Sequence, residues 1–123
     1  MALALGVGLA AALGALARFL LDQAVGRRLE SGLPWGTWVI NVSGSFVLGL
    51  VTGLALHHGL PASTVSLLGT GICGGYTTFS TFSVETVRLA EDGSYVEAAA
   101  NIGGSLAAGL LAAAAGLGLA LVV

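Results

Sequence analysis

The chain alternates between four long apolar stretches and short segments that hold most of its charged residues. The apolar stretches cover about residues 2–21, 35–56, 64–90 and 98–121. A hydrocarbon core of about 30 Å is crossed by about 20 helical residues, so each stretch is long enough to span a membrane. The pattern therefore predicts an all-α membrane protein with four transmembrane helices in a single domain, residues 1–123.

Composition agrees with this pattern and narrows the function. Of 123 residues, 56% are hydrophobic and 8% are charged, and the mean hydropathy is +0.98. The connections are short, so little chain remains for a soluble catalytic domain, and we expect no enzymatic activity. The net charge of −2 also argues against a nucleic-acid partner. These features predict a multi-pass protein of the cell membrane.

The few charges of the connecting segments bear on orientation. Arg27, Arg28 and Arg88 flank the first and third connections, which favours a cytoplasmic location for both connections. His57 and His58 lie in the second connection, where solvated turn residues are common, and we assign them no function.

An internal repeat relates the second and fourth stretches. "NVSGSFVLGL" begins at Asn41 and "NIGGSLAAGL" begins at Asn101. A step of four residues turns a helix by about 40°, so residues at this spacing form one stripe. The two stripes are Asn41, Ser45, Gly49 and Gly53, and Asn101, Ser105, Gly109 and Ala113. Small residues at this spacing are typical of close helix packing, whereas amides at membrane depth tend to line pathways.

The stretch "GICGGYTTFSTFSVET", residues 71–86, is unusual for a membrane span. Gly71, Gly74 and Gly75 each weaken helix propensity by about 1 kcal/mol relative to alanine, which predicts a break near residues 74–78. Broken backbone at membrane depth is tolerated where protein or a polar cavity satisfies it. Its carbonyl groups suit a cation such as sodium, and its amide and hydroxyl donors suit an anion.

Beyond the predicted break, hydroxyl and aromatic side chains share one helix face: Thr78, Thr81, Phe82 and Glu85, flanked by Phe79 and Ser80. One interpretation is structural, with hydroxyls bonded to carbonyls one turn earlier and the rings serving as packing. The other is that electropositive ring edges and neutral donors receive a small dehydrated anion without holding it too tightly.

At these residues the chain resembles the Fluc/CrcB family of fluoride channels. "GGYTTFSTF" at residues 74–82, followed by Glu85, is similar to the signature of that family and is highly specific. The resemblance extends over the whole chain, through "GALARF" with Arg18, "GTWVINVSGSFVLG" with Asn41, and "NIGGSLAAGL" with Asn101.

The resemblance implies a fold and a mechanism. Members of this family are four-helix subunits that pair as antiparallel, dual-topology dimers. Each dimer has two fluoride pathways and a structural sodium ion at its centre, bound by backbone carbonyls of the broken third span. The implied function is a passive, fluoride-selective channel that exports cytoplasmic fluoride and confers fluoride resistance.

The resemblance also implies roles for individual residues. Gly74 and Thr77 match the sodium positions. The anion pathway matches Asn41, Phe79, Phe82, Ser80, Thr81 and Ser105. Arg18, Glu85 and Asn101 match supporting polar positions, and that of Asn101 is often aromatic in the family. Because the arginines favour one orientation and the family uses both, the partner is either a second copy of the chain or an oppositely oriented relative.

Two other functions are consistent with a small four-span protein. A small multidrug exporter needs a membrane-embedded carboxylate for proton coupling, usually in the first span, but that span offers only Arg18 and the terminal Asp22. A membrane assembly protein would depend on its glycines for packing and would tolerate Asn41→Ala or Thr81→Ala.

Overall fold

The computed structural model describes residues 1–26 and 32–123, which form helices joined by short turns. Three of the described helices are long and apolar enough to cross a membrane: α1 (Ala2–Gly26), α2 (Trp35–His58) and α6 (Tyr95–Leu119). The third span consists of α3 (Ala62–Val65), the π-helix η1 (Ser66–Cys73), α4 (Gly74–Tyr76) and α5 (Ser80–Glu91). The predicted all-α fold with a broken third span is confirmed.

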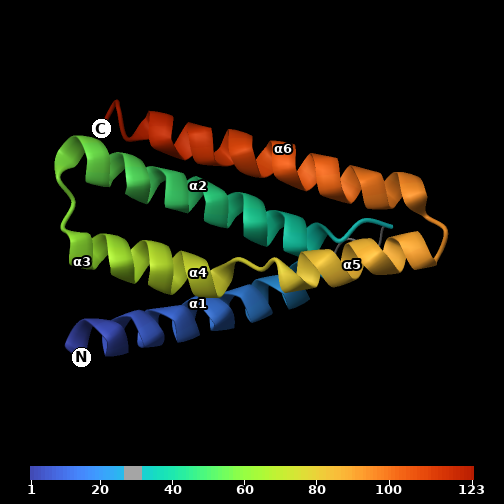
Figure 1. Ribbon diagram of the computed structural model, residues 1–123, viewed down its shortest axis with the longest axis horizontal. Coiled ribbons are helices and arrows are strands. Elements are labelled where there is room, and N and C mark those ends of the chain that lie inside the picture. Colours follow the sequence, from blue (N-terminus) through green and yellow to red (C-terminus); the bar gives the residue numbers. More distant parts are fainter. Residues whose placement is uncertain (27–31) are drawn as a thin grey trace.

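The bundle is organised around α2, which packs against α6 and contacts the third span and α1 (Figure 1). α1 runs along η1 and α4, and α5 packs against α6. Both termini lie at the same end of the bundle, as an even number of crossings requires (Figure 1). The leucines of α1 and α6 are largely exposed, so in a membrane these surfaces face lipid or another subunit.

The third span loses its helical geometry at residues 77–79. Thr77 is extended, with φ −75° and ψ 160°, and α5 begins at Ser80. The break therefore falls at the C-terminal end of the predicted stretch, and Gly74 and Gly75 are helical. The glycines lie just before the break, and their effect on helix propensity stays a prediction.

The glycines allow the third span to approach α1 closely. A Cβ at Gly75 would overlap the carbonyl oxygen of Ala11, and one at Gly14 on α1 would overlap the carbonyl oxygen of Ile72. A Cβ at Gly71 would lie 2.7 Å from the Cβ of Ala10. Backbone contact of this kind is a common way to pack helices in membranes.

Replacing Gly75 with alanine is expected to destabilise the fold by about 1–3 kcal/mol, since the added methyl group meets backbone that cannot move aside. The thermal stability of the purified protein in detergent measures this effect. Gly8→Ala on α1 is the matched control, because a Cβ at Gly8 meets no atom within 4 Å. Equal stability of the two variants would contradict the packing described here.

Glycines also bring the middle of α2 against the C-terminal half of α6. A Cβ at Gly49 would overlap the carbonyl oxygen of Ala113, and one at Gly116 would overlap that of Phe46. The interpretation of Gly49 and Gly53 as a small-residue packing seam is therefore confirmed. One turn earlier on α2, the same stripe turns from packing to an open groove, which begins at Ser45.

Candidate functional site

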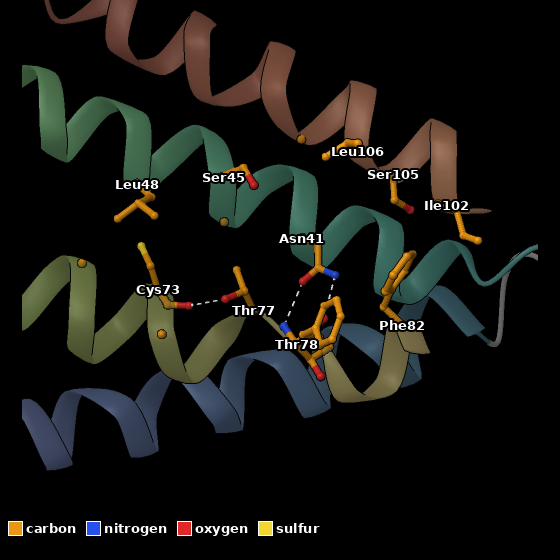
Figure 2. A pocket seen from close by; sticks show the side chains of 15 residues that line it. Asn41, Ser45, Leu48, Cys73, Thr77, Thr78, Phe82, Ile102, Ser105 and Leu106 are labelled. Atoms are coloured by element: carbon orange, nitrogen blue, oxygen red, sulfur yellow. Dashed lines mark hydrogen bonds between the residues drawn. The ribbon is translucent and has the colours of Figure 1, made fainter. Parts of the chain in front are cut away.

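The break in the third span is bridged by one side chain from α2. Nδ2 of Asn41 donates a hydrogen bond to the carbonyl oxygen of Thr78, and Oδ1 of Asn41 accepts one from the Thr78 backbone N–H, each at 2.9 Å (Figure 2). The side-chain amide thus supplies both partners that a helix would have given to Thr78. One N–H of the Asn41 amide is left over, because a primary amide carries two donors.

The hydroxyl of Thr78 starts the helix that follows the break. It accepts a hydrogen bond from the backbone N–H of Thr81 at 3.2 Å and donates one to the Thr81 hydroxyl at 3.0 Å. The hydroxyls of Thr78 and Ser80 are 3.3 Å apart. Ser80 and Thr81 therefore belong to a hydroxyl cluster around Thr78, in which they stabilise the first turn of α5.

Several backbone carbonyls at the break lose their usual helical donors, and those of Gly74 and Thr77 are among them. The Thr78 N–H, which would donate to the carbonyl of Gly74 in a continuous helix, donates to Asn41. The Thr81 N–H, which would donate to the carbonyl of Thr77, donates to the Thr78 hydroxyl. The carbonyls of Gly74 and Thr77 are the pair that the sequence resemblance assigns to sodium, and they retain lone pairs for another ligand.

A groove of about 500 Å³ runs along this face of the protein, between α2, the third span and α6. It brings together predicted residues from all three, and its polar lining consists of neutral groups. The lining includes Asn41, Ser45, Gly74, Thr77, Thr78, Phe79, Phe82 and Ser105. Predicted residues Ser80 and Thr81 are not part of the lining and reach it only through Thr78.

The aromatic rings of Phe79 and Phe82 form one wall of this groove. Their centroids are 5.8 Å apart, and the ring planes are tilted by 39°. The Phe79 side chain is 79% exposed although it lies within a membrane span. A tilted pair presents ring edges as well as faces, and the edges carry the positive end of the ring quadrupole.

Asn101, the counterpart of Asn41 in the repeat, has a different role. It is fully buried, at 0% exposure, and does not line the groove. Its Oδ1 accepts a hydrogen bond from Nε1 of Trp38 at 2.7 Å, and its Nδ2 donates one to the Thr86 hydroxyl at 2.8 Å. Asn101 therefore joins α2, α5 and α6 in the interior, whereas Ser105 and Gly109, one and two turns later on the same stripe, line the groove.

Replacing Asn101 with leucine is expected to destabilise the fold by about 2–4 kcal/mol, because the Trp38 indole and the Thr86 hydroxyl both lose their partner. Trp38→Phe removes one of these bonds and has a smaller effect. The double variant should be less destabilised than the sum of the single variants, since they share a bond. Thermal unfolding in detergent measures all three, and strict additivity would contradict the network.

The remaining polar positions lie outside the groove. Oε1 of Glu85 accepts a hydrogen bond from the Thr37 hydroxyl at 2.9 Å, and Oε2 is buried without a hydrogen-bond partner in the described chain. Arg18 lies half-buried on α1. Nε2 of His58 is 2.8 Å from the carbonyl oxygen of Ala120, so it ties the end of α2 to the end of α6.

The orientation hypothesis depends on residues that the structure leaves out. Arg27 and Arg28 lie outside the described ranges, so the cytoplasmic location of the first and third connections stays a prediction. The sequence interpretation also missed two polar groups at membrane depth, Trp38 and Thr37. An indole N–H or a hydroxyl within a span needs a partner, and this requirement is the signal that points to both.

Comparison with known proteins identifies a family that matches most of the chain. Residues 5–117 match the model of the family described as CrcB-like protein, Camphor Resistance (CrcB). A protein of Frankia casuarinae named Fluoride-specific ion channel FluC 1 is 51% identical over 115 residues, which cover 89% of each chain. Relatives with the same name from Leifsonia xyli and Thermobifida fusca are 54% and 46% identical, and cover 94% and 93% of this chain and 82% and 92% of their own.

These matches, together with three described helices able to span a membrane, make this a multi-pass membrane protein. The third-span signature on which the sequence resemblance rests lies at the break, and Asn41 on α2 bridges that break. The chain belongs to the CrcB family.

Proposed function

We propose that this protein is a passive, fluoride-selective ion channel that exports fluoride from the cytoplasm. The observation that carries the proposal is the groove at the broken third span, where the Asn41 side chain binds the backbone of Thr78 beside the exposed residue Phe79. The names of relatives at 46–54% identity support it. We propose an ion channel rather than an enzyme because the groove offers donors and aromatic rings.

The groove suits a small anion that must bind and leave quickly. Among the described residues that line it, none carries a charge, so the anion meets neutral donors. Asn41 has one free N–H, and the edges of Phe79 and Phe82 supply weak positive potential. Fluoride can be stripped of part of its water by these groups without being trapped by a fixed cation.

A single subunit leaves this path incomplete. The groove is open along one side, and the Phe79 ring is exposed there. An anion path through a membrane has to be shielded from lipid, so a second polypeptide must cover the open side. We propose an antiparallel dimer, formed by two copies of this chain or by this chain and an oppositely oriented relative.

The residues at the break fit a structural sodium ion. The carbonyls of Gly74 and Thr77 are without their usual helical donors, and oxygen ligands of this kind suit a hard cation. Sodium bound there would supply a positive charge that joins the broken third spans of two subunits. Gly74 and Thr77 would hold it, because Asn41 and the Thr78 hydroxyl accept from the backbone N–H groups that would donate to these two carbonyls in a continuous helix.

Replacing Gly74 with valine tests this site without disturbing the subunit. A Cβ at Gly74 would meet only the carbonyl oxygen of Gly69, at 3.8 Å, so the first side-chain carbon has room within one protomer. We expect the variant to remain folded. Sodium should slow subunit exchange of its dimer at least about tenfold less than it slows exchange of the wild-type dimer, and exchange rates with and without sodium measure this effect. A dimer with unchanged sodium dependence would contradict the assignment.

The proposed function is tested by fluoride efflux from liposomes that contain the purified protein. Vesicles are loaded with potassium fluoride or potassium chloride, and valinomycin is added to release the accompanying charge. We expect rapid loss of fluoride and retention of chloride. Retention of both ions by vesicles containing folded dimer would overturn the proposal, and equal loss of both would overturn its selectivity.

A further inference from the structure

Ser45 stands where two grooves meet on α2. It lies one helical turn after Asn41 and lines the main groove described above. It also lines a second groove of about 330 Å³ between α2 and α6, which is bordered by Gly49, Thr52 and Ala113. Figure 2 shows Asn41 nearer the third span and Ser45 nearer α6, so the two side chains face different parts of the same space.

The hydroxyl of Ser45 differs from the other hydroxyls of α2 in having a free donor. Thr37 donates to Glu85, Ser43 donates to the carbonyl of Val39, and Thr52 donates to the carbonyl of Leu48. No hydrogen bond joins Ser45 to any residue that the structure describes. A hydroxyl at membrane depth without a partner favours a polar ligand, because its desolvation is otherwise uncompensated.

The wall opposite Ser45 has no side chain. Asn101, Ser105 and Gly109 follow one another by single turns on α6, and the polar row of this helix stops at Gly109. A Cβ built on Gly109 would have the Ser45 hydroxyl oxygen as its neighbour, at 3.6 Å. The Ser45 hydroxyl on α2 therefore lies beside Gly109, where the polar row of Asn101 and Ser105 on α6 would otherwise continue.

We infer that Ser45 is a further anion-contacting residue, which takes over from Ser105 and donates a hydrogen bond to the permeating ion beside Gly109. The inference rests on the proposed function. The ligand class is a small anion that has lost part of its water, since the neighbouring lining residues Leu48 and Leu106 offer no other donor. The Ser105 hydroxyl donates to Oδ1 of Asn101 at 3.4 Å, so Ser45 supplies the free donor where the ion passes from α6 toward α2.

Three variants in the liposome assay test this inference. Ser45→Ala removes the donor and should slow fluoride efflux by about tenfold or more, the effect of losing one hydrogen bond to a charged group. Ser66→Ala is the control, because its hydroxyl is bonded to the Ala62 carbonyl and lines neither groove. The double variant Ser45→Gly/Gly109→Ser moves the hydroxyl to α6 and should restore efflux to within about threefold of wild type.

Each outcome distinguishes the two proposals. Wild-type vesicles that retain fluoride overturn the proposed function and this inference with it. Wild-type vesicles that lose fluoride while Ser45→Ala is equally fast overturn this inference alone. A double variant no faster than Ser45→Gly by itself also overturns it, since the position of the hydroxyl would then not matter.

Discussion

Replacing Asn41 with alanine is expected to reduce fluoride efflux by about one-hundredfold. The variant leaves the N–H and the carbonyl of Thr78 without the partners that the side chain provides in the wild type. Each unsatisfied group costs about 1–3 kcal/mol, so the break either closes into another geometry or opens to disorder. In both cases the donor that faces the groove is lost as well. The measurement is efflux from liposomes at matched protein density.

The Ser66→Ala variant serves as the control for Asn41→Ala, since it removes a polar group of the third span that bonds only within its own helix. Size-exclusion chromatography of both variants shows whether the dimer persists. Wild-type efflux from Asn41→Ala would show that neither the bridge at the break nor the free N–H is needed for conduction. A dimer that persists without conduction would place the defect in the pathway rather than in assembly.

Replacing Phe79 or Phe82 with isoleucine is expected to slow fluoride efflux by at least about tenfold while leaving the dimer intact. Isoleucine retains apolar bulk but lacks the ring quadrupole, so the electropositive edge that faces the groove disappears. A tenfold effect corresponds to about 1.4 kcal/mol in the barrier, a plausible contribution for one desolvated ring. Efflux and size-exclusion profiles are measured for each variant.

Phe19→Ile on α1 is the matched control for the two ring variants. The Phe19 side chain is 59% exposed and lies on a helix that does not line the groove. It should retain wild-type efflux, because only the lipid-facing or subunit-facing surface changes. Unchanged efflux in both Phe79→Ile and Phe82→Ile would remove the aromatic edges from the mechanism and leave the polar groups of the groove, above all the N–H of Asn41, as the pathway.

The sequence identified six of the fifteen residues that the structure brings together in the groove. Asn41, Gly74, Thr77, Phe79, Phe82 and Ser105 were all predicted and all line one groove. The resemblance to the Fluc/CrcB family assigned these positions, and helical spacing alone only placed some of them on shared faces, because residues at steps of three and four lie on one side of a helix. The break was also predicted. The glycines near it serve contact with α1, and that contact depends on a helix distant in sequence.

Asn41 and Asn101 show most clearly where sequence information ends. The repeat gives them equivalent places on two stripes, and periodicity alone assigns them equivalent roles. In the structure one bridges the broken backbone at the groove and the other is fully buried between Trp38 and Thr86.

The sequence by itself determined the membrane environment, the number of spans, the interruption of the third span and the family, because these follow from hydropathy, span length and local motif. Only the tertiary structure decided which of the two equivalent asparagines faces the groove and which is buried in the interior. A helix fixes the direction of each side chain relative to its own axis, whereas the neighbour that the side chain meets is set by how the helices pack.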